Sequence, residues 1–158
     1  MTIAATVGDA LAFEGIEFRI LRASADVPTG EGLRSAGVEP ECCVKAQLLK
    51  DAQGYLLTVT AATRVLDMDV LRRELHRELV PAADEDLDDL FCDCELGSVP
   101  PLGPWYRIPT VVDSSLRQHP NIYFDAGEPR AWVEVTEQGF EKLLAGAEYF
   151  AFSRRARS

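Results

Sequence analysis

The segment from Cys43 to Ala61 constrains the fold more than any other part of this chain, because its pattern is typical of a β-hairpin. The apolar run 43–49 predicts one strand, the run 55–61 predicts the returning strand, and residues 50–54 (Lys-Asp-Ala-Gln-Gly) have the composition of a turn. Because side chains alternate along a strand, one face should carry Cys43, Lys45 and Gln47, and the other Val44, Ala46 and Leu48.

Lys45 is the unusual residue of this hairpin, since it lies between Val44 and Ala46 in the middle of a strand. Charged side chains are rarely buried without a partner, so an exposed-face or edge-strand lysine is one interpretation. The other is a functional lysine whose charge orients or polarises a substrate.

A stiff loop with bare backbone lies further along the chain, and it consists of Gly97, Ser98, Val99, Pro100, Pro101, Leu102 and Gly103. Its two prolines fix φ and remove two N–H donors, while its flanking glycines permit positive φ and close approach of a ligand. We expect the remaining N–H groups to be free to bind a small polar group. Taken alone, such a loop is more often a plain proline-rich connector.

The rest of the chain shows no internal repeat and no linker, so we expect a single domain over residues 1–158. Hydrophobic spacing and capping residues predict helices over 3–13, 32–36, 69–79 and 84–91, and a last helix that Thr136 caps. Further strands are expected over 17–23, 108–112, 122–126 and 131–135, with a turn at 26–30. Asp69 is the expected cap of the 69–79 helix, and residues 153–158 are expected to form a short basic C-terminal tail, frayed from Arg154 onward.

The formal net charge of −10 argues against sequence-independent gripping of a long nucleic acid, because that affinity comes from neutralising phosphates. A local basic patch could still touch one end of an RNA. The expected helix over 69–79 carries such a patch, which consists of Arg72, Arg73, His76 and Arg77. We interpret this patch as a solvated helix face or, alternatively, as an RNA contact. The apolar runs are too short for a membrane helix and the N-terminus lacks a basic signal region, so we expect a cytoplasmic protein with no membrane partner.

The sequence offers no self-contained catalytic set. Its cysteines occur as Cys42-Cys43 and Cys92-x-Cys94, which lack the two-residue spacer of zinc ligands and indicate free thiols. The acidic run 84–89 resembles a calcium loop only superficially, since its sixth position is not glycine, so we expect no metal and no cofactor. No nucleophile elbow occurs, and neither histidine lies beside a cysteine or a carboxylate in a telling pattern.

Four stretches taken together resemble the YbaK / prolyl-tRNA synthetase-associated editing domain family. They are Cys43–Leu48, Cys94–Gly103, Ile108–Leu116 and Ile122–Gly127. The resemblance runs in matching order over about 16–144, which is most of the chain. It implies an α+β fold with a curved, mixed and mostly antiparallel sheet, partly barrel-like, and surrounding helices.

The resemblance also implies an activity, namely metal-independent hydrolysis of the ester of a mischarged aminoacyl-tRNA in trans. Lys45 is then the catalytic residue. The loop 97–103 and the late turn would bind the substrate, and that turn consists of Asp125, Ala126 and Gly127. The implied partners are the acceptor end of a mischarged tRNA and, if activity needs one, an aminoacyl-tRNA synthetase; DNA is not expected.

One departure from the family pattern follows this turn. Many relatives carry a histidine just after the late glycine, whereas this chain has Glu128, Pro129 and Arg130. The departure and the acidic charge favour a second hypothesis, a non-catalytic module that binds a small ligand or a protein on the same scaffold. A third hypothesis is a different esterase or thioesterase that uses the same pocket.

Overall fold

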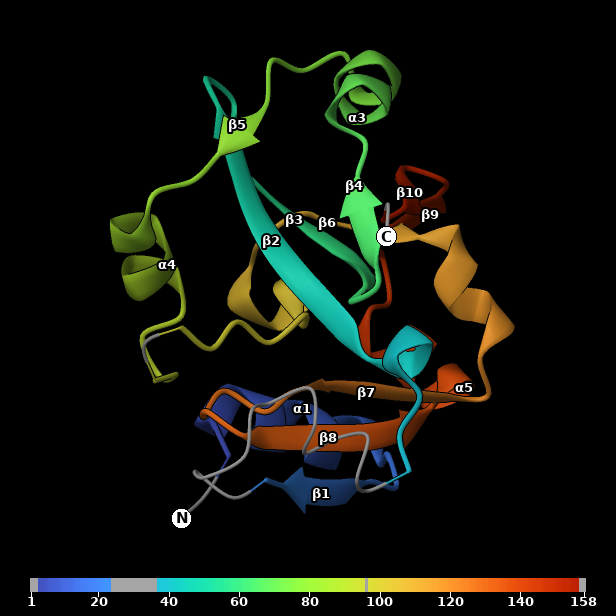
Figure 1. Ribbon diagram of the computed structural model, residues 1–158. Helices are drawn as coiled ribbons and strands as arrows, with labels where there is room; N and C mark the ends of the chain where they lie inside the picture. The colour runs from blue at the N-terminus through green and yellow to red at the C-terminus, as the bar shows by residue number, and fades with distance from the viewer. Residues whose placement is uncertain (1–2, 24–36, 96, 157–158) are drawn as a thin grey trace.

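The computed structural model describes residues 3–23, 37–95 and 97–156, which form two sheets, a short ribbon and surrounding helices (Figure 1). The turn expected at 26–30 and the helix expected over 32–36 lie outside the described residues. The largest sheet has five strands in the order β5-β2-β3-β6-β9.

The predicted hairpin is the centre of this sheet. β2 (Val44–Asp51) and β3 (Gly54–Ala61) pair antiparallel along their whole length. β5 (Val80–Pro81) pairs antiparallel with the other edge of β2, while β6 (Thr110–Asp113) and then β9 (Glu148–Phe150) extend the sheet in parallel. The last six residues of β3 are all buried, as expected for a strand with partners on both sides and a β-branched and leucine-rich sequence.

A three-stranded antiparallel sheet lies beneath the first sheet in Figure 1. Its order is β1 (Arg19–Arg22), β8 (Ala131–Thr136) and β7 (Asn121–Asp125). Its core-facing side chains alternate along the strands, and they are Ile122, Phe124, Ala131, Val133 and Val135. The two sheets touch where Cys43 forms an isolated parallel bridge with Tyr123.

The C-terminal segment forms a two-stranded ribbon. β10 (Ser153–Arg155) pairs antiparallel with β4 (Arg64–Leu66), and Arg155 lies opposite Arg64. The expectation of a tail frayed from Arg154 onward is therefore wrong for this strand. Its partner strand lies far earlier in the sequence, so no local pattern reveals the pairing.

The carboxylate of Asp113, at the end of β6, anchors this ribbon. It is only 2 % exposed, and its Oδ1 accepts hydrogen bonds from the backbone N–H groups of Phe152 (2.9 Å) and Ser153 (3.0 Å). Its Oδ2 accepts hydrogen bonds from Ser115. Burial alone would raise the pKa of Asp113, but these hydrogen bonds hold it below its ordinary value.

Four described helices pack around the sheets. α1 (Ala5–Glu14) ends at Gly15, which has a left-handed φ of 63°, in agreement with the sequence pattern. α4 (Asp84–Leu90) lies on the left of Figure 1, beside β2. α5 (Glu137–Leu143) begins after Thr136, whose hydroxyl accepts a first-turn hydrogen bond as predicted.

α3 (Met68–Leu75) differs from its prediction at both ends. Its cap is Asp67, whose carboxylate accepts the first-turn hydrogen bond, rather than Asp69. The helix ends at His76, which adopts a left-handed φ of 53°, and so it does not reach Leu79. Leu79 is fully buried all the same, because the chain turns back after the helix and returns this side chain to the same core cluster.

The fold class is α+β with mixed, mostly antiparallel sheets, as the sequence predicts. The partly barrel-like expectation is not supported, because the strands of the described residues form separate sheets that meet only locally. The sequence pattern did not predict the shortest strands, which are β4, β5, β9 and β10.

Candidate functional site

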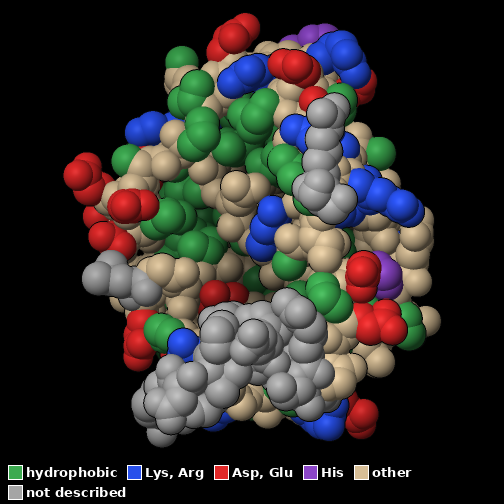
Figure 2. All heavy atoms as spheres, viewed as in Figure 1, with side chains coloured by type: hydrophobic (Ala, Val, Ile, Leu, Met, Phe, Trp, Pro, Cys, Tyr) green, Lys and Arg blue, Asp and Glu red, His purple; other side chains and the backbone are tan. Residues whose placement is uncertain are grey.

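The loop 97–103 divides into a front that lines two clefts and a back that belongs to the core. Residues 97–99 line a cleft of about 560 Å³ beside α4. Gly97 and Ser98 also line a second cleft of about 360 Å³ together with Asp125. Figure 2 shows this face of the molecule hollowed between α4 and β2, with hydrophobic side chains in the hollow. The front of the loop is therefore the part that can meet a ligand.

The back of the loop consists of Pro100, Pro101, Leu102 and Gly103, and all four residues are buried. The family resemblance assigns them to substrate binding. Leu102 is fully inaccessible and packs in the main core cluster. Gly103 has no room for a side chain, because a Cβ there would overlap the Thr110 hydroxyl and approach the Ile108 carbonyl oxygen to 3.1 Å. These four residues hold the loop in position and do not line either cleft.

The carboxylate of Asp125 connects the loop to the late turn. The Gly127 N–H donates a 2.7 Å hydrogen bond to Asp125 Oδ1, and the Val99 N–H and the Ser98 side chain also donate to this carboxylate. Burial raises the pKa of Asp125 to about 6, although the three hydrogen bonds act in the opposite direction. The structure thus brings together the front of the loop and the turn 125–127, which are distant in sequence.

The expectation of free loop amides is wrong at two positions. The Ser98 N–H donates to the Glu95 carbonyl oxygen (3.0 Å), and the Val99 N–H donates to the Asp125 carboxylate. The acceptor at Val99 comes from a strand distant in sequence, so the loop's own composition could not reveal it.

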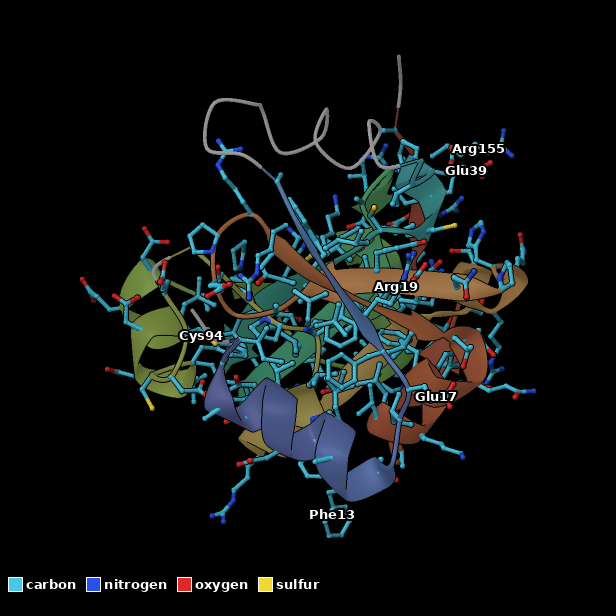
Figure 3. All side chains as sticks on the ribbon, turned by 90° about the horizontal axis from the view of Figure 1, so that it is seen from below. Phe13, Glu17, Arg19, Glu39, Cys94 and Arg155 are labelled. Carbon is cyan, nitrogen blue, oxygen red and sulfur yellow. The ribbon has the colours of Figure 1, made fainter. Side chains whose placement is uncertain are left out.

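Gly127 occupies a crowded position that only glycine tolerates. Its φ is 91°, and a Cβ there would overlap the Ala4 side chain and come within 3.2 Å of Cys94 Sγ. The neighbouring backbone is paired on both sides, because the Ala4 N–H donates to the Ala126 carbonyl (3.0 Å) and the Glu95 N–H donates to the Gly127 carbonyl (2.9 Å). Figure 3 shows Cys94 near the N-terminal end of α1, so the turn is held between these two segments.

A polar cluster that the sequence pattern did not indicate lies behind the turn. The Tyr106 hydroxyl donates to Asp93 Oδ1 (2.9 Å) and lies 3.3 Å from Cys94 Sγ, while the Thr6 N–H donates to Asp93 Oδ2 (2.8 Å). Burial raises the pKa of Cys94 to about 12, so this thiol stays protonated and is a poor nucleophile at neutral pH. The cluster therefore supports the turn and supplies no covalent chemistry.

Lys45 lies close to this site along the strands, although it lines neither cleft. β2 and β7 run parallel at the Cys43–Tyr123 bridge, and Lys45 and Asp125 each lie two residues past it. The Lys45 side chain is half-buried and forms no hydrogen bond or ion pair with the described residues. Its ammonium group is therefore available for a ligand.

Thr60 shares the sheet face of Lys45, because residues directly opposite in an antiparallel pair point to the same side. Its side chain is 1 % exposed, and its hydroxyl finds no hydrogen-bond partner among the described residues. A buried hydroxyl without a partner is unfavourable for stability and is often found at functional positions. The sequence pattern did not single out Thr60, since threonine is ordinary in a strand.

Glu128 stands where many relatives have a histidine, and the structure gives it a specific role. It is 4 % exposed and forms an ion pair with Arg22 of β1. It also lines the second cleft beside Gly97 and Ser98. The departure from the family pattern therefore introduces a buried, paired carboxylate at the cleft wall.

Two other candidates from the sequence have structural roles. Arg77 of the basic patch binds Asp51 in the hairpin turn (2.6 Å between Nη2 and Oδ1) and so attaches α3 to the sheet. Asp86 of the acidic run pairs with Lys50 (2.9 Å). Within the ranges that the structure describes, no group of three or more histidine, cysteine or acidic side chains is placed to hold a metal ion. In the same ranges, no helix is long and apolar enough to cross a membrane.

Comparison with known proteins places this architecture in a family. Residues 26–143 match the model of the aminoacyl-tRNA editing domain. This match spans most of the chain, and it includes Lys45, the loop 97–103 and the turn 125–127. The protein belongs to the aminoacyl-tRNA editing domain family.

Solved structures share the fold at low sequence identity. A candidate trans-editing enzyme for prolyl-tRNA synthetase superposes with a TM-score of 0.82 at 24% identity, covering 96% of both chains. A scaffold protein used to present grafted linear epitopes gives a TM-score of 0.83 at 23% identity, covering 97% of both chains. A candidate signal transduction protein from Marinobacter aquaeolei gives 0.74 at 21% identity, where the match covers 94% of this chain and 30% of that one. At these identities the likeness establishes the fold.

Proposed function

We propose that this protein is a trans-editing deacylase that hydrolyses the ester bond between a wrongly attached amino acid and the terminal ribose of a tRNA. Its membership in the aminoacyl-tRNA editing domain family supports the substrate class. The observation that carries the proposal is the junction of the front of the loop with the late turn, where Asp125 binds Ser98, Val99 and Gly127 beside a cleft. An ester needs no further activation, so such a site can act by orientation and charge.

Lys45 is the proposed catalytic residue of this reaction. Water attacks the ester carbonyl carbon, negative charge develops on the carbonyl oxygen, and a nearby ammonium group stabilises that charge. The bond to the ribose oxygen then breaks, the ribose oxygen takes up one proton of the attacking water, the other proton passes to solvent, and the amino acid leaves as a carboxylate. Lys45 suits this role because its side chain has no partner among the described residues and lies near the Asp125 end of β7.

The turn 125–127 is proposed to receive the amino-acid part of the substrate. Gly127 is buried and its N–H donates to the Asp125 carboxylate, so it positions this carboxyl group, which provides an acceptor at the wall of the second cleft. Of the loop, only residues 97–99 are proposed to contact the substrate, because residues 100–103 are buried. Which amino acid is removed depends on the cleft that contains Glu128.

A non-catalytic binding module remains a specific second candidate. It is favoured by the Ser98 and Val99 amides, which are already bound to groups of the protein and so are not open to stabilise an oxyanion. It is also favoured by the Glu128–Arg22 ion pair, which stands in place of the histidine of many relatives. Such a module would bind an aminoacyl ligand without hydrolysing it.

Incubation of the protein with a panel of mischarged tRNAs separates the two candidates. We expect wild type to release the amino acid from at least one of them, and Lys45→Ala to lower kcat/KM by about 10²-fold or more while the free energy of unfolding stays unchanged. Lys50→Ala is the matched control, because Lys50 lies on the same strand but pairs with Asp86, and it should retain activity. Full activity of Lys45→Ala would refute the catalytic assignment, and binding without release by wild type would favour the module.

A further inference from the structure

We propose that the β4–β10 ribbon is a binding surface for the phosphate backbone of the tRNA acceptor stem, with Arg154 and Arg155 as its phosphate contacts. This inference rests on the proposed function, and it adds a second contact region outside the cleft. It concerns the strand that the sequence pattern would leave as a frayed tail.

The ribbon fixes two arginines on the surface. β10 pairs with β4, so Arg154 lies opposite Val65 and Arg155 lies opposite Arg64. Both arginines of β10 are exposed and have no carboxylate partner among the described residues. Figure 3 labels Arg155 at the rim of the molecule, away from α1 and the three-stranded sheet. Ordered arginines lose less entropy on binding a phosphate than arginines of a frayed tail would.

The strand beneath these arginines is held from inside the molecule. Arg64 donates from Nε to the Ser153 hydroxyl (2.6 Å) and from Nη2 to the Ser153 carbonyl oxygen (3.1 Å), so its guanidinium group braces the ribbon. Asp113 binds the N–H groups at the start of β10. The arginines of β10 are therefore presented by a rigid support and remain free to face a ligand.

The other basic group of the molecule is less available. Arg77, which follows α3, is bound to Asp51, and Arg72 of α3 donates from Nε to the Leu79 carbonyl oxygen (3.0 Å). Arg73 lies 3.9 Å from the neighbouring carboxylate of Glu74. Within the ribbon, Arg64 lies 3.9 Å from Asp113, whereas Arg154 and Arg155 have no acidic partner among the described residues.

The charge of the protein is distributed unevenly around the hollowed face. Figure 2 shows acidic side chains gathered on the left over α4, whereas Lys and Arg side chains occur on the upper right over α3 and the ribbon, with acidic side chains among those of α3. An anionic stem approaching a protein of net charge −10 is repelled by the first side and attracted to the second. This difference in charge favours an orientation in which the nucleic acid lies over the ribbon side of the cleft and away from α4.

The ribbon lies at a suitable distance from Lys45. Thr60 is directly opposite Lys45, about 5 Å away. From Thr60 to Arg64 the chain advances four residues, which span at most about 14 Å. Arg155 lies directly opposite Arg64, a further step of about 5 Å, so the backbone of the phosphate contacts is within about 24 Å of the proposed catalytic lysine. A few terminal nucleotides can therefore connect the ester in the cleft to the stem on the ribbon.

The test measures binding of uncharged tRNA as a function of salt concentration, by fluorescence anisotropy. We expect the Arg154→Ala/Arg155→Ala double variant to bind tRNA about tenfold or more weakly, and its plot of log K against log salt to be shallower by about 1 to 2 units. Arg154→Lys/Arg155→Lys keeps the charge and should retain the salt slope. Arg72→Ala/Arg73→Ala on α3 is the matched control and should leave tRNA affinity within twofold.

Kinetics with two substrates distinguish this inference from the proposed function. For a mischarged full-length tRNA, the double alanine variant should raise KM about tenfold and leave kcat unchanged; for an aminoacylated acceptor fragment without a stem, both constants should match wild type. Unchanged tRNA affinity, or tight polyglutamate binding in place of tRNA, would overturn the inference, and the latter would indicate an acidic protein partner. If wild type binds tRNA through Arg154 and Arg155 but releases no amino acid, the ribbon assignment holds and the deacylase proposal fails.

Discussion

Lys45 and Asp125 leave the junction between β2 and β7 in the same direction, each two residues beyond it. The two strands belong to different sheets and diverge from this point (Figure 1). The contact between the two sheets at the Cys43–Tyr123 bridge therefore brings the backbone positions of Lys45 and Asp125 near each other. The relative position of Lys45 and Asp125 is therefore set by the junction of the two sheets, and the residues next to each of them in sequence do not reveal it.

Asp125 should give the stability of the protein a specific pH dependence. Its pKa is raised to about 6 in the folded state, against an ordinary value of 3.8, so between these values the folded protein binds more protons than the unfolded chain. The free energy of unfolding contributed by this group therefore falls as pH rises from about 4 to 6. Asp125→Asn should remove that fall, as measured by urea unfolding at several pH values.

Asp86→Asn is the control with the opposite sign. Hydrogen bonds from Lys50 and Tyr55 lower the pKa of Asp86 to about 2, so its contribution is complete above about 3.8 and is lost as pH falls toward 2. The asparagine variant should therefore be less stable than wild type at neutral pH and similar to it near pH 2. An Asp125→Asn profile parallel to that of wild type would contradict the raised pKa.

Replacement of Thr60 by valine should raise stability and lower activity together. The Thr60 hydroxyl is buried without a partner, and valine has nearly the same shape, so we expect the free energy of unfolding to rise by about 1 kcal/mol. If this hydroxyl helps Lys45 hold the ester or the attacking water, kcat/KM should fall by about tenfold. Thermal unfolding and a deacylation assay on the same preparation measure both, and Thr60→Ser should keep the activity. A valine variant with unchanged kcat/KM would make Thr60 purely structural.

Two glycines of the proposed site should respond very differently to alanine. Gly127 has positive φ and no room for a Cβ, so Gly127→Ala should cost about 2–4 kcal/mol of stability. Gly97 has a similar φ of 86° but open space around it, so Gly97→Ala should cost only about 1 kcal/mol. Urea denaturation of both variants measures the difference. Equal losses of unfolding free energy would show that the positive φ, and not the space around the Cβ, determines the cost of the substitution.

Gly103 and Thr110 should be coupled energetically. Gly103→Ala introduces a methyl group into the Thr110 hydroxyl and should destabilise the protein by about 2–3 kcal/mol. Thr110→Ala removes the overlapping atom, so the double variant should be more stable than the sum of the two single losses predicts, by about 1 kcal/mol. A double-mutant cycle of unfolding free energies measures this coupling. Strict additivity would mean that the loop shifts to relieve the overlap.

The hairpin was predictable because its determinants are local. The apolar runs before and after the turn specify both strands, and Gly54, with φ of 131°, completes the turn where the composition places it. Helix α1 was predictable for the same reason, since its spacing and its terminal Gly15 act within a few residues. The end of α3 was not, because His76 takes a left-handed conformation, which is uncommon for any residue other than glycine.

The sequence proposed the members of the candidate site, whereas several of their contacts depend on how the sheets meet. The proximity of the loop to the turn 125–127 followed from the family resemblance, whereas the capture of the Val99 amide by Asp125 depends on the meeting of two sheets. The burial of Pro100 to Gly103 was not predictable, since a rigid loop and a buried loop have the same composition. Thr60 was invisible to pattern analysis, because its significance is an unmatched hydroxyl beside Lys45.

The hydrogen bonds between Asp113 and the amides of Phe152 and Ser153 bear on how the protein forms during synthesis. The partners are 39 and 40 residues apart, so a chain still being made carries the carboxylate of β6 long before its donors exist. Until then the carboxylate has the hydrogen bonds from Ser115 and the Arg64 guanidinium group 3.9 Å away, but no donor for Oδ1 from the C-terminal segment, so its burial in the closed sheet is less favourable. We therefore expect the large sheet to gain its full stability only once Phe152 and Ser153 are in place, and the basic ribbon to form at the same stage.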